Sequence, residues 1–286
     1  MIVTRLCGGL GNQFFQYAAG RALALRCHTD LALDTEWFER TIPGMEPRTY
    51  ELHRYPIRAR LLRDPEREKI RSRLAAGRKR FSFPPRWTQF TEPDFNCYHP
   101  AVLGLRGHVY LDGFWQYPDY FQDAAPQIRA ELVPSAAVCD PDPAIVRRIK
   151  EVNSVSIHVR RGDYLTSGQF IGALPAAYYS AALAWISSRV ENPHFFVFSD
   201  DPNWVRENFP IAARVDYMAH EGPDAAFKDF HLMSECRHHV IANSSFSWWA
   251  AWLSSSESPL VVAPARWFTQ LPPSTHSRLA QGWTAF

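Results

Sequence analysis

The sequence predicts an α/β fold whose mostly parallel sheets are divided between two domains. Short apolar runs alternate with helix-like patterns along much of the chain, which is typical of parallel sheets with helices on both faces. A length of 286 residues slightly favours two domains over one. Pro134, Pro141 and Pro143 mark the best linker candidate. We therefore expect an N-terminal domain over residues 1–135 and a C-terminal domain over residues 136–286.

The N-terminal domain opens as a strand, a glycine turn, a helix and a second strand. Residues 2–7 form the first strand, and the Gly-Gly-Leu-Gly run at 8–11 ends it. Apolar residues at spacings of three and four predict a helix from about Asn12, and residues 28–34 follow as a strand. This order is the start of an α/β unit.

The rest of the N-terminal domain is less regular. Residues 58–80 are rich in arginine and lysine and are expected to be helical in part. We interpret them as a solvated helix face, and the alternative is a patch for the anionic inner membrane or an acidic acceptor. Residues 81–100 carry four prolines and are predicted as a packed surface loop. A strand at 109–114 and a helical segment to about Leu132 complete the domain.

The C-terminal domain alternates regularly between helix and strand. Its middle strand, Phe195 to Phe198, is continuously apolar, as in strands that are buried on both faces. The pattern predicts strands at 154–160, 195–198, 239–242 and 260–263, helices near 143–152, 175–190 and 224–237, and a tryptophan-rich helix before the last strand.

The composition excludes several classes of protein. A formal net charge of +2 gives no field that would favour nucleic acid. The five cysteines are scattered and odd in number, which favours reduced thiols over disulfides or a structural zinc site. The first apolar run is too short for a signal peptide, and nowhere do eighteen apolar residues run together. We therefore expect a cytoplasmic protein, and the sequence says nothing about its oligomeric state.

Four loops are candidates for ligand binding, because ligands of parallel sheets bind beyond the carboxyl ends of the strands. The loop at 158–163, His-Val-Arg-Arg-Gly-Asp, carries the strongest signal. His158 and Arg160 point to the same side of their strand, and Arg161 and Asp163 follow it. Two guanidinium groups, an imidazole and a carboxylate at a strand end suit a phosphorylated ligand. The alternative is an exposed strand end held by salt bridges.

The glycine loop at residues 8–13 is the second candidate. Gly9 and Gly11 let a ligand approach the backbone closely, and the start of the following helix favours an anion. A tight structural turn explains the same residues equally well.

The serine loop at 243–249 is the third candidate. Hydroxyl groups and exposed N–H groups at a helix start form a neutral phosphate cradle. The hydroxyls belong to Ser244, Ser245 and Ser247. The tryptophans of this helix are interpreted as core residues.

The Ser-Asp-Asp-Pro loop at 199–202 is the fourth candidate. Either Asp200 or Asp201 can cap the next helix, with Pro202 in its first turn. The other aspartate can accept hydrogen bonds from a base or a sugar, and a carboxylate suits the paired donors of guanine.

No metal site is expected. Asp140-Pro141-Asp142 imitates the Asp-x-Asp metal motif of some sugar transferases, but it lies in the proline-rich linker, so we interpret it as helix capping.

Taken together, the four loops resemble glycosyltransferase family 11, the α-1,2-fucosyltransferases, of bacterial length. The resemblance covers nearly the whole chain and is weakest over 35–105. The matching motifs are Gly-Gly-Leu-Gly-Asn-Gln at 8–13, His-Val-Arg-Arg-Gly-Asp-Tyr at 158–164, Phe-Ser-Asp-Asp at 198–201 and Asn-Ser-Ser-Phe-Ser-Trp-Trp at 243–249.

The resemblance implies a fold and a reaction. The fold is of the GT-B type, with two Rossmann-like domains whose mostly parallel sheets face a central cleft. The C-terminal domain is expected to bind GDP-fucose and the N-terminal domain to bind the acceptor. The reaction inverts the anomeric carbon and uses neither a metal ion nor another cofactor. The family acceptor is a terminal β-galactose, on an O-antigen repeat or a lactose-like oligosaccharide.

The resemblance also implies roles for the motif residues. Arg160 is expected at the β-phosphate, because departing GDP needs a cation where no metal is available. Arg161 supports it or fixes Asp163, and Asp163 is either the general base or an orienting group. The remaining expected contacts are His158 in the nucleotide pocket, Asp200 at guanine, Asp229 as a weaker candidate nearby, Ser244, Ser245 and Ser247 at the phosphates, and Asn12 near the fucose and β-phosphate.

Two rival functions stay open. One is a fucosyltransferase of another linkage, such as the α-1,6 type, which shares the His-x-Arg-Arg pattern. The other is a GDP-sugar-binding protein without transferase activity.

Overall fold

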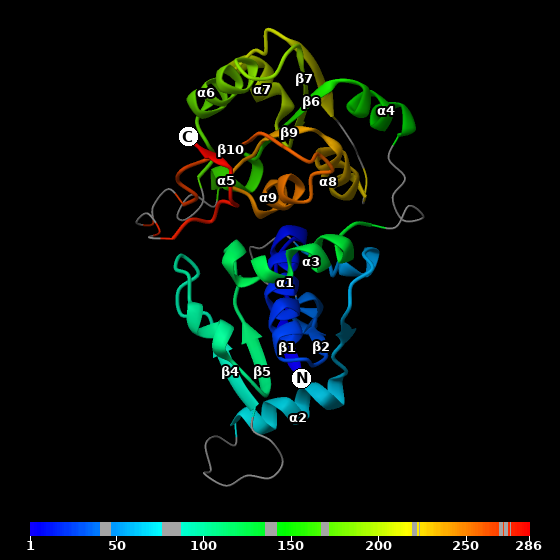
Figure 1. Ribbon diagram of the computed structural model, residues 1–286, viewed down its shortest axis with the longest axis vertical. Helices are drawn as coiled ribbons and strands as arrows, with labels where there is room; N and C mark the ends of the chain where they lie inside the picture. The colour runs from blue at the N-terminus through cyan, green and yellow to red at the C-terminus, as the bar shows by residue number, and fades with distance from the viewer. Residues whose placement is uncertain are drawn as a thin grey trace. The chain divides into compact units, whose positions relative to one another are not determined.

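The computed structural model describes residues 1–40, 47–75, 87–134, 142–166, 172–218, 222, 224–268, 271, 274 and 276–286. The chain forms two compact units, each built on one sheet (Figure 1). The first contains Met1–Ser135 and Thr275–Arg278, and the second contains Ala136–Ser274 and Leu279–Phe286. The sequence predicts two consecutive domains. It does not predict that Thr275–Arg278, near the end of the chain, belong to the first unit.

The first unit is built on a five-stranded sheet in the order β3-β2-β1-β5-β4. Its described strand pairs are all parallel. Because β1 is the central strand, the loop that follows it opens at the middle of the carboxyl edge of the sheet. The strands are β1 (Ile2–Arg5), β2 (Leu31–Asp34), β3 (Arg60–Leu61), β4 (Trp87–Thr91) and β5 (His108–Asp112).

Helices pack on both faces of this sheet. One face lies against α1, where a Cβ at Gly20 would come 2.0 Å from Thr4 Oγ1, so the close contact requires glycine. The other face lies against α2, whose Ile70 packs on Val3 and Ala32. The helices are α1 (Leu10–Arg26), α2 (Asp64–Ala75) and α3 (Ala125–Glu131), with 3-10 turns η1 (Glu36–Glu39), η2 (Leu52–Arg54), η3 (Pro100–Gly104), η4 (Pro118–Tyr120) and η5 (Gln122–Ala124).

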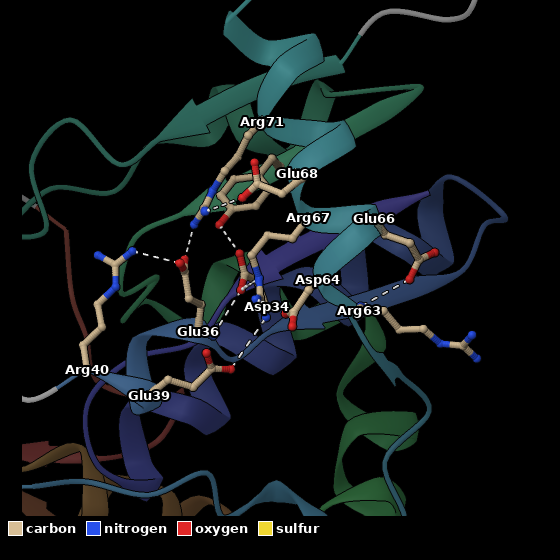
Figure 2. A network of polar contacts seen from close by, with 11 residues as sticks. Asp34, Glu36, Glu39, Arg40, Arg63, Asp64, Glu66, Arg67, Glu68 and Arg71 are labelled. Atoms are coloured by element: carbon tan, nitrogen blue, oxygen red, sulfur yellow. Dashed lines mark hydrogen bonds and ion pairs between the residues drawn. The ribbon is translucent and has the colours of Figure 1, made fainter.

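A network of ion pairs joins the end of β2 to α2 (Figure 2). Buried Asp34 accepts hydrogen bonds from Arg67 Nε at 3.0 Å and from the Tyr110 hydroxyl at 2.7 Å. Further ion pairs join Arg60 to Glu66 and Arg71 to Glu36 and Glu68. Arg60, Arg67 and Arg71 of the predicted basic face are therefore paired with carboxylates.

The second unit is built on a six-stranded sheet in the order β11-β10-β9-β6-β7-β8. Its described strand pairs are also parallel. Since β6 lies between β7 and β9, the loops that follow these three strands are neighbours. The strands are β6 (Asn153–Val159), β7 (Pro193–Ser199), β8 (Arg214–Met218), β9 (His238–Val240), β10 (Val261–Ala263) and β11 (Thr284–Ala285).

Both faces of β6 are buried. Val155, Ile157 and Val159 pack into one core with α6 and α7. On the other face, the ring of His158 lies 5.7 Å from that of Phe246 in α9. The helices of this unit are α4 (Pro143–Glu151), α5 (Gly162–Thr166), α6 (Ala176–Ser187), α7 (Pro202–Asn208), α8 (Ala225–Glu235) and α9 (Ser245–Trp252).

The predicted α/β class with mostly parallel sheets is confirmed, but the prediction is wrong for one segment. Residues 87–91, assigned to a surface loop, form β4, which pairs with β5 along its whole length. The prolines of the segment lie outside these five residues, and Trp87 stacks on His108 with ring centroids 5.1 Å apart. The edge strands β8 and β11 and the short helix α5 have no counterpart in the prediction either.

Candidate functional site

Three of the four predicted loops meet at the carboxyl edge of the second sheet. They follow β6, β7 and β9, which are adjacent strands. Tyr164, in the helix that follows β6, donates a hydrogen bond to the carbonyl of Asn243, beyond β9, at 3.3 Å. The glycine loop belongs to the first unit.

Asp200 organises the turn after β6. Its Oδ1 accepts the backbone N–H of Arg161 at 2.8 Å, and its Oδ2 accepts that of Gly162 at 3.1 Å. The same Oδ2 lies 3.1 Å from Nη1 of Arg160. A Cβ at residue 162 would come 2.9 Å from this oxygen, so glycine fits the turn best. Asp200 therefore holds Arg160 and its turn, which differs from the guanine contact expected from the sequence.

Asp201 is the aspartate that caps α7. Its side chain accepts the N–H of Trp204 at 3.1 Å, with Pro202 in the first turn. It also binds Nε of Arg161 at 3.0 Å, and the Arg161 guanidinium lies 3.7 Å from the centre of the Trp204 ring. Arg161 is thereby fastened to the start of α7.

Arg160 is the more exposed arginine, with 28% of its side chain accessible against 15% for Arg161. Its guanidinium lies 5.8 Å from the ring centre of Tyr164. Of the two, Arg160 is thus better placed to meet a ligand. The side chain of Asp163 lies outside the described part of the structure, so its role as base or orienting group stays a prediction.

His158 is a neutral, buried ring. Burial, with the neighbouring charge of Arg160, lowers the pKa of His158 to about 3. Its Nδ1 has no hydrogen-bond partner among the described residues. At neutral pH the ring is therefore uncharged and cannot supply a positive charge.

The three serines of the serine loop differ in burial. The Ser247 hydroxyl is fully buried and donates to the carbonyl of Ser244 at 3.3 Å, so its predicted position at the phosphates has no support in this structure. Ser244, the N-cap residue of α9, is also buried, and Ser245 is half-buried at the first helical position. Trp248 and Trp249 are fully buried, which confirms their interpretation as core residues.

Hydrogen bonds within the first unit hold the glycine loop. Gly8 has a φ of +76°, which favours glycine, and Gly9 is the N-cap residue of α1. Gly11 is buried in the first turn of α1, which begins at Leu10, two residues before the predicted start at Asn12. Gln13 donates to the Gly8 and Thr49 carbonyls at 3.1 and 2.9 Å. Asn12 Oδ1 accepts a hydrogen bond from Gln116 at 2.9 Å.

Helix capping is confirmed for Asp142 of the metal-like motif, because its side chain accepts the N–H of Ala144 at 2.8 Å. Among the described residues, no group of three or more His, Cys, Asp or Glu side chains is arranged to hold a metal ion. No helix within the described ranges is long and apolar enough to span a bilayer. Asp229, the weaker nucleotide candidate, is half-buried in α8.

Sequence reasoning missed three residues that shape these loops. Trp204 stacks on Arg161, Glu92 holds the loop after β5, and Gln116 joins that loop to the glycine loop. A capping aspartate at 201 does place residue 204 near its carboxylate, so Trp204 carried a weak signal. Glu92 and Gln116 meet their partners only through the pairing of distant strands.

Comparison with known proteins decides the family. The family model described as glycosyl transferase family 11 matches residues 88–285. The chain belongs to glycosyl transferase family 11. An α-1,2-colitosyltransferase of Escherichia coli is 32% identical to this family 11 chain, over 94% of this chain and 92% of the relative. The O-antigen biosynthesis glycosyltransferase WbnK of Escherichia coli is 31% identical, over 92% and 93% respectively.

More distant similarities agree with this membership. A galactoside α-(1,2)-fucosyltransferase 1 of Leontocebus fuscicollis is 32% identical over 60% of the family 11 chain and 50% of the relative. Among solved structures, NodZ α-1,6-fucosyltransferase soaked with GDP-fucose matches with a TM-score of 0.50 and 14% identity, over 88% of this chain and 91% of that chain. At this identity the match concerns the fold, which is GT-B-like.

Proposed function

We propose that the protein transfers L-fucose from GDP-β-L-fucose to the 2-hydroxyl of a terminal β-galactose on a glycan, with inversion and without a metal ion. Family membership supports glycosyl transfer, and the relatives named for α-1,2 transfer support the linkage. The observation that carries the proposal is the pair of Arg160 and Asp200 at the carboxyl edge of the second sheet.

In the proposed reaction, the galactose 2-hydroxyl oxygen attacks the anomeric carbon of fucose from the face opposite the diphosphate. The bond from that carbon to the β-phosphate oxygen breaks, and its electron pair leaves with GDP. Negative charge therefore grows on the β-phosphate. Asp200 holds the Arg160 guanidinium in place, and a cation fixed in advance stabilises such charge without reorganising during the reaction.

Other groups of the second unit complete the proposed donor site. Backbone N–H groups at the start of α9, next to Ser244 and Ser245, suit the phosphates. The hydroxyl proton of galactose has to pass to a carboxylate or to water, and Asp163 is our candidate because it lies inside the matched motif. His158, being neutral, is proposed as a hydrogen-bonding wall of the nucleotide pocket.

The donor sugar has one specific rival. The α-1,2-colitosyltransferase is similar over nearly its whole length, and colitose is fucose without its 3-hydroxyl. Transfer of colitose is therefore the second candidate function. The similarity of this chain to the O-antigen biosynthesis glycosyltransferase WbnK makes an O-antigen acceptor worth testing. A peripheral membrane contact and a cytoplasmic location stay predictions from the sequence.

The test is a transfer assay with GDP-fucose and GDP-colitose against β-galactosides that include lactose, with the product linkage read by NMR. We expect an α-1,2 product and a loss of roughly 10²–10³-fold in turnover for Arg160→Ala. Arg206→Ala is the matched control, because Arg206 also stacks on a tyrosine, at 4.1 Å, but on the surface of α7. An α-1,6 product would favour a fucosyltransferase of that linkage. No product from either donor would favour a GDP-sugar-binding protein without transferase activity.

A further inference from the structure

A hydrogen bond between two side-chain amides connects the loops after β1 and β5, which are neighbouring strands of the first sheet. Nε2 of Gln116 donates to Oδ1 of Asn12 at 2.9 Å. An amide has its acceptor on one end and its donors on the other. The bond therefore determines which end of Asn12 faces Gln116, and it leaves the N–H₂ group of Asn12 for another partner.

The N–H₂ end of Asn12 lies over Gly8. A Cβ at residue 8 would come 2.5 Å from Asn12 Nδ2, and the φ of Gly8 is +76°. A side chain at position 8 would thus displace the donor end of Asn12. Glycine keeps the space beside the amide nitrogen open for a close ligand.

Gln116 is presented by a turn that needs support. The preceding residue, Trp115, is fully buried and has a φ of +56°, a region that large side chains avoid unless their surroundings hold them there. Glu92, just after β4, supplies that support, since its carboxylate accepts the N–H of Phe114 at 2.6 Å and that of Trp115 at 3.3 Å.

Gly113, which precedes the turn, also lies close to Glu92. A Cβ at Gly113 would come 2.5 Å from Cβ of Glu92 and 2.9 Å from the Trp115 ring. The carboxylate, the glycine and the left-handed turn therefore form one packed unit, which fixes where the side chain of Gln116 begins.

We propose that Gln116 is a positioning residue for the transfer reaction: it orients the amide of Asn12 so that its N–H₂ group donates to an oxygen of the sugar-diphosphate donor, and Glu92 holds the turn that presents Gln116. This inference rests on the proposed function, because the expected place of Asn12 beside the donor comes from the family resemblance.

The decisive variants are Gln116→Met and Gln116→Glu. Methionine has a similar length but makes no hydrogen bond to Asn12, so we expect kcat to fall about tenfold, the upper range for one hydrogen bond. Glutamate can only accept, so it turns the Asn12 amide around, and we expect a loss on the order of 100-fold. Gln89→Glu, on exposed β4, is the control for added charge and should keep wild-type kinetics.

Two readouts separate positioning from simple destabilisation. The loss should fall on kcat while the acceptor KM stays within about twofold, and Gln116→Glu should cause no further loss once Asn12 is alanine. Independently of activity, the ¹⁵N side-chain resonance of Asn12, identified by its absence in Asn12→Asp, should shift in Gln116→Glu and not in Gln89→Glu. For the turn, Glu92→Gln should keep more activity than Glu92→Ala, because the amide oxygen still accepts an N–H.

The possible failures are distinct. If the wild-type protein transfers neither fucose nor colitose, the proposed function falls and this proposal falls with it. If the wild-type protein is active but Gln116→Glu keeps more than half of its kcat, or if its loss simply adds to that of Asn12→Ala, the positioning role alone is overturned.

Discussion

Asp200→Asn separates two explanations of the aspartate after β7. The carboxylate accepts two backbone N–H groups and lies beside the Arg160 guanidinium. Asparagine keeps one acceptor oxygen and turns an N–H₂ group toward the other donors. If Asp200 positions Arg160, the substitution should release the guanidinium from its fixed place and slow the chemical step.

The size of the effect follows from these contacts. Losing one charge-assisted hydrogen bond costs about 1.5–3 kcal/mol, so we expect the free energy of unfolding to fall by about 1–3 kcal/mol. Poorer stabilisation of the departing diphosphate should lower kcat roughly 10- to 100-fold, which corresponds to about 1.4–2.7 kcal/mol. The affinity for GDP should change less than kcat, and the preference for GDP over UDP should remain.

The assay measures kcat at saturating donor, the Kd of GDP and UDP by calorimetry, and unfolding in urea. Asp201→Asn is the matched control, because it loosens Arg161 and the cap of α7. It should reduce stability by a similar amount with a smaller effect on kcat. A normal kcat together with a lost preference for GDP would refute the positioning role and restore the guanine contact.

Three further outcomes are expected. Chelation of divalent cations should leave turnover within about twofold of untreated enzyme, and a loss that Mg²⁺ or Mn²⁺ restores would contradict the proposed role of Arg160. Burial lowers the pKa of both His158 and His239 to about 3, so below their ordinary value of 6.5 only the unfolded chain gains these protons, and stability should fall as the pH drops. The free energy of unfolding should fall with pH by up to about 1.4 kcal/mol per pH unit for each ring. Urea unfolding at pH 7 and pH 5 should show a smaller loss of stability in acid for His158→Phe than for the wild-type protein. An equal loss would refute this explanation. Arg67→Leu leaves buried Asp34 without its cation and should reduce the free energy of unfolding by about 3–5 kcal/mol, whereas a change below about 1 kcal/mol would mean that the network of Figure 2 contributes little.

The sequence predicts those parts of the fold whose signals are local. The alternating pattern of β6, the apolar run of β7 and the glycine turn before α1 are readable because strand alternation, burial on both faces and helix periodicity each leave a pattern in a few residues. β4 has no such pattern: its residues are largely exposed or half-buried, and it becomes a strand because β5 lies beside it. The return of Thr275–Arg278 to the first unit is likewise a consequence of tertiary contacts, among them the hydrogen bond from Arg278 to Asn96 at 3.0 Å.

The candidate site likewise combines features that the sequence predicts with features that only the tertiary contacts decide. The motif at 158–163 identifies where the ligand-binding edge lies, but residue types alone do not tell which of two adjacent arginines is available. That is decided by partners from other segments. Ser247 illustrates the opposite error, since its position in a serine-rich motif suggests a phosphate contact while the helix places its hydroxyl in the core.

Arg160 and Arg161 show why consecutive identical residues can do different things. Successive side chains beyond a strand leave in different directions, and here each arginine meets one of two consecutive aspartates. Arg161 is bound to Asp201 and covered by Trp204, so moving it would cost both an ion pair and a stacking contact. Arg160 is held by Asp200 at one end and keeps more of its surface accessible. Because Arg160 is fixed by Asp200 yet keeps more of its side chain accessible than Arg161, we propose the charge-stabilising role for Arg160 rather than for Arg161.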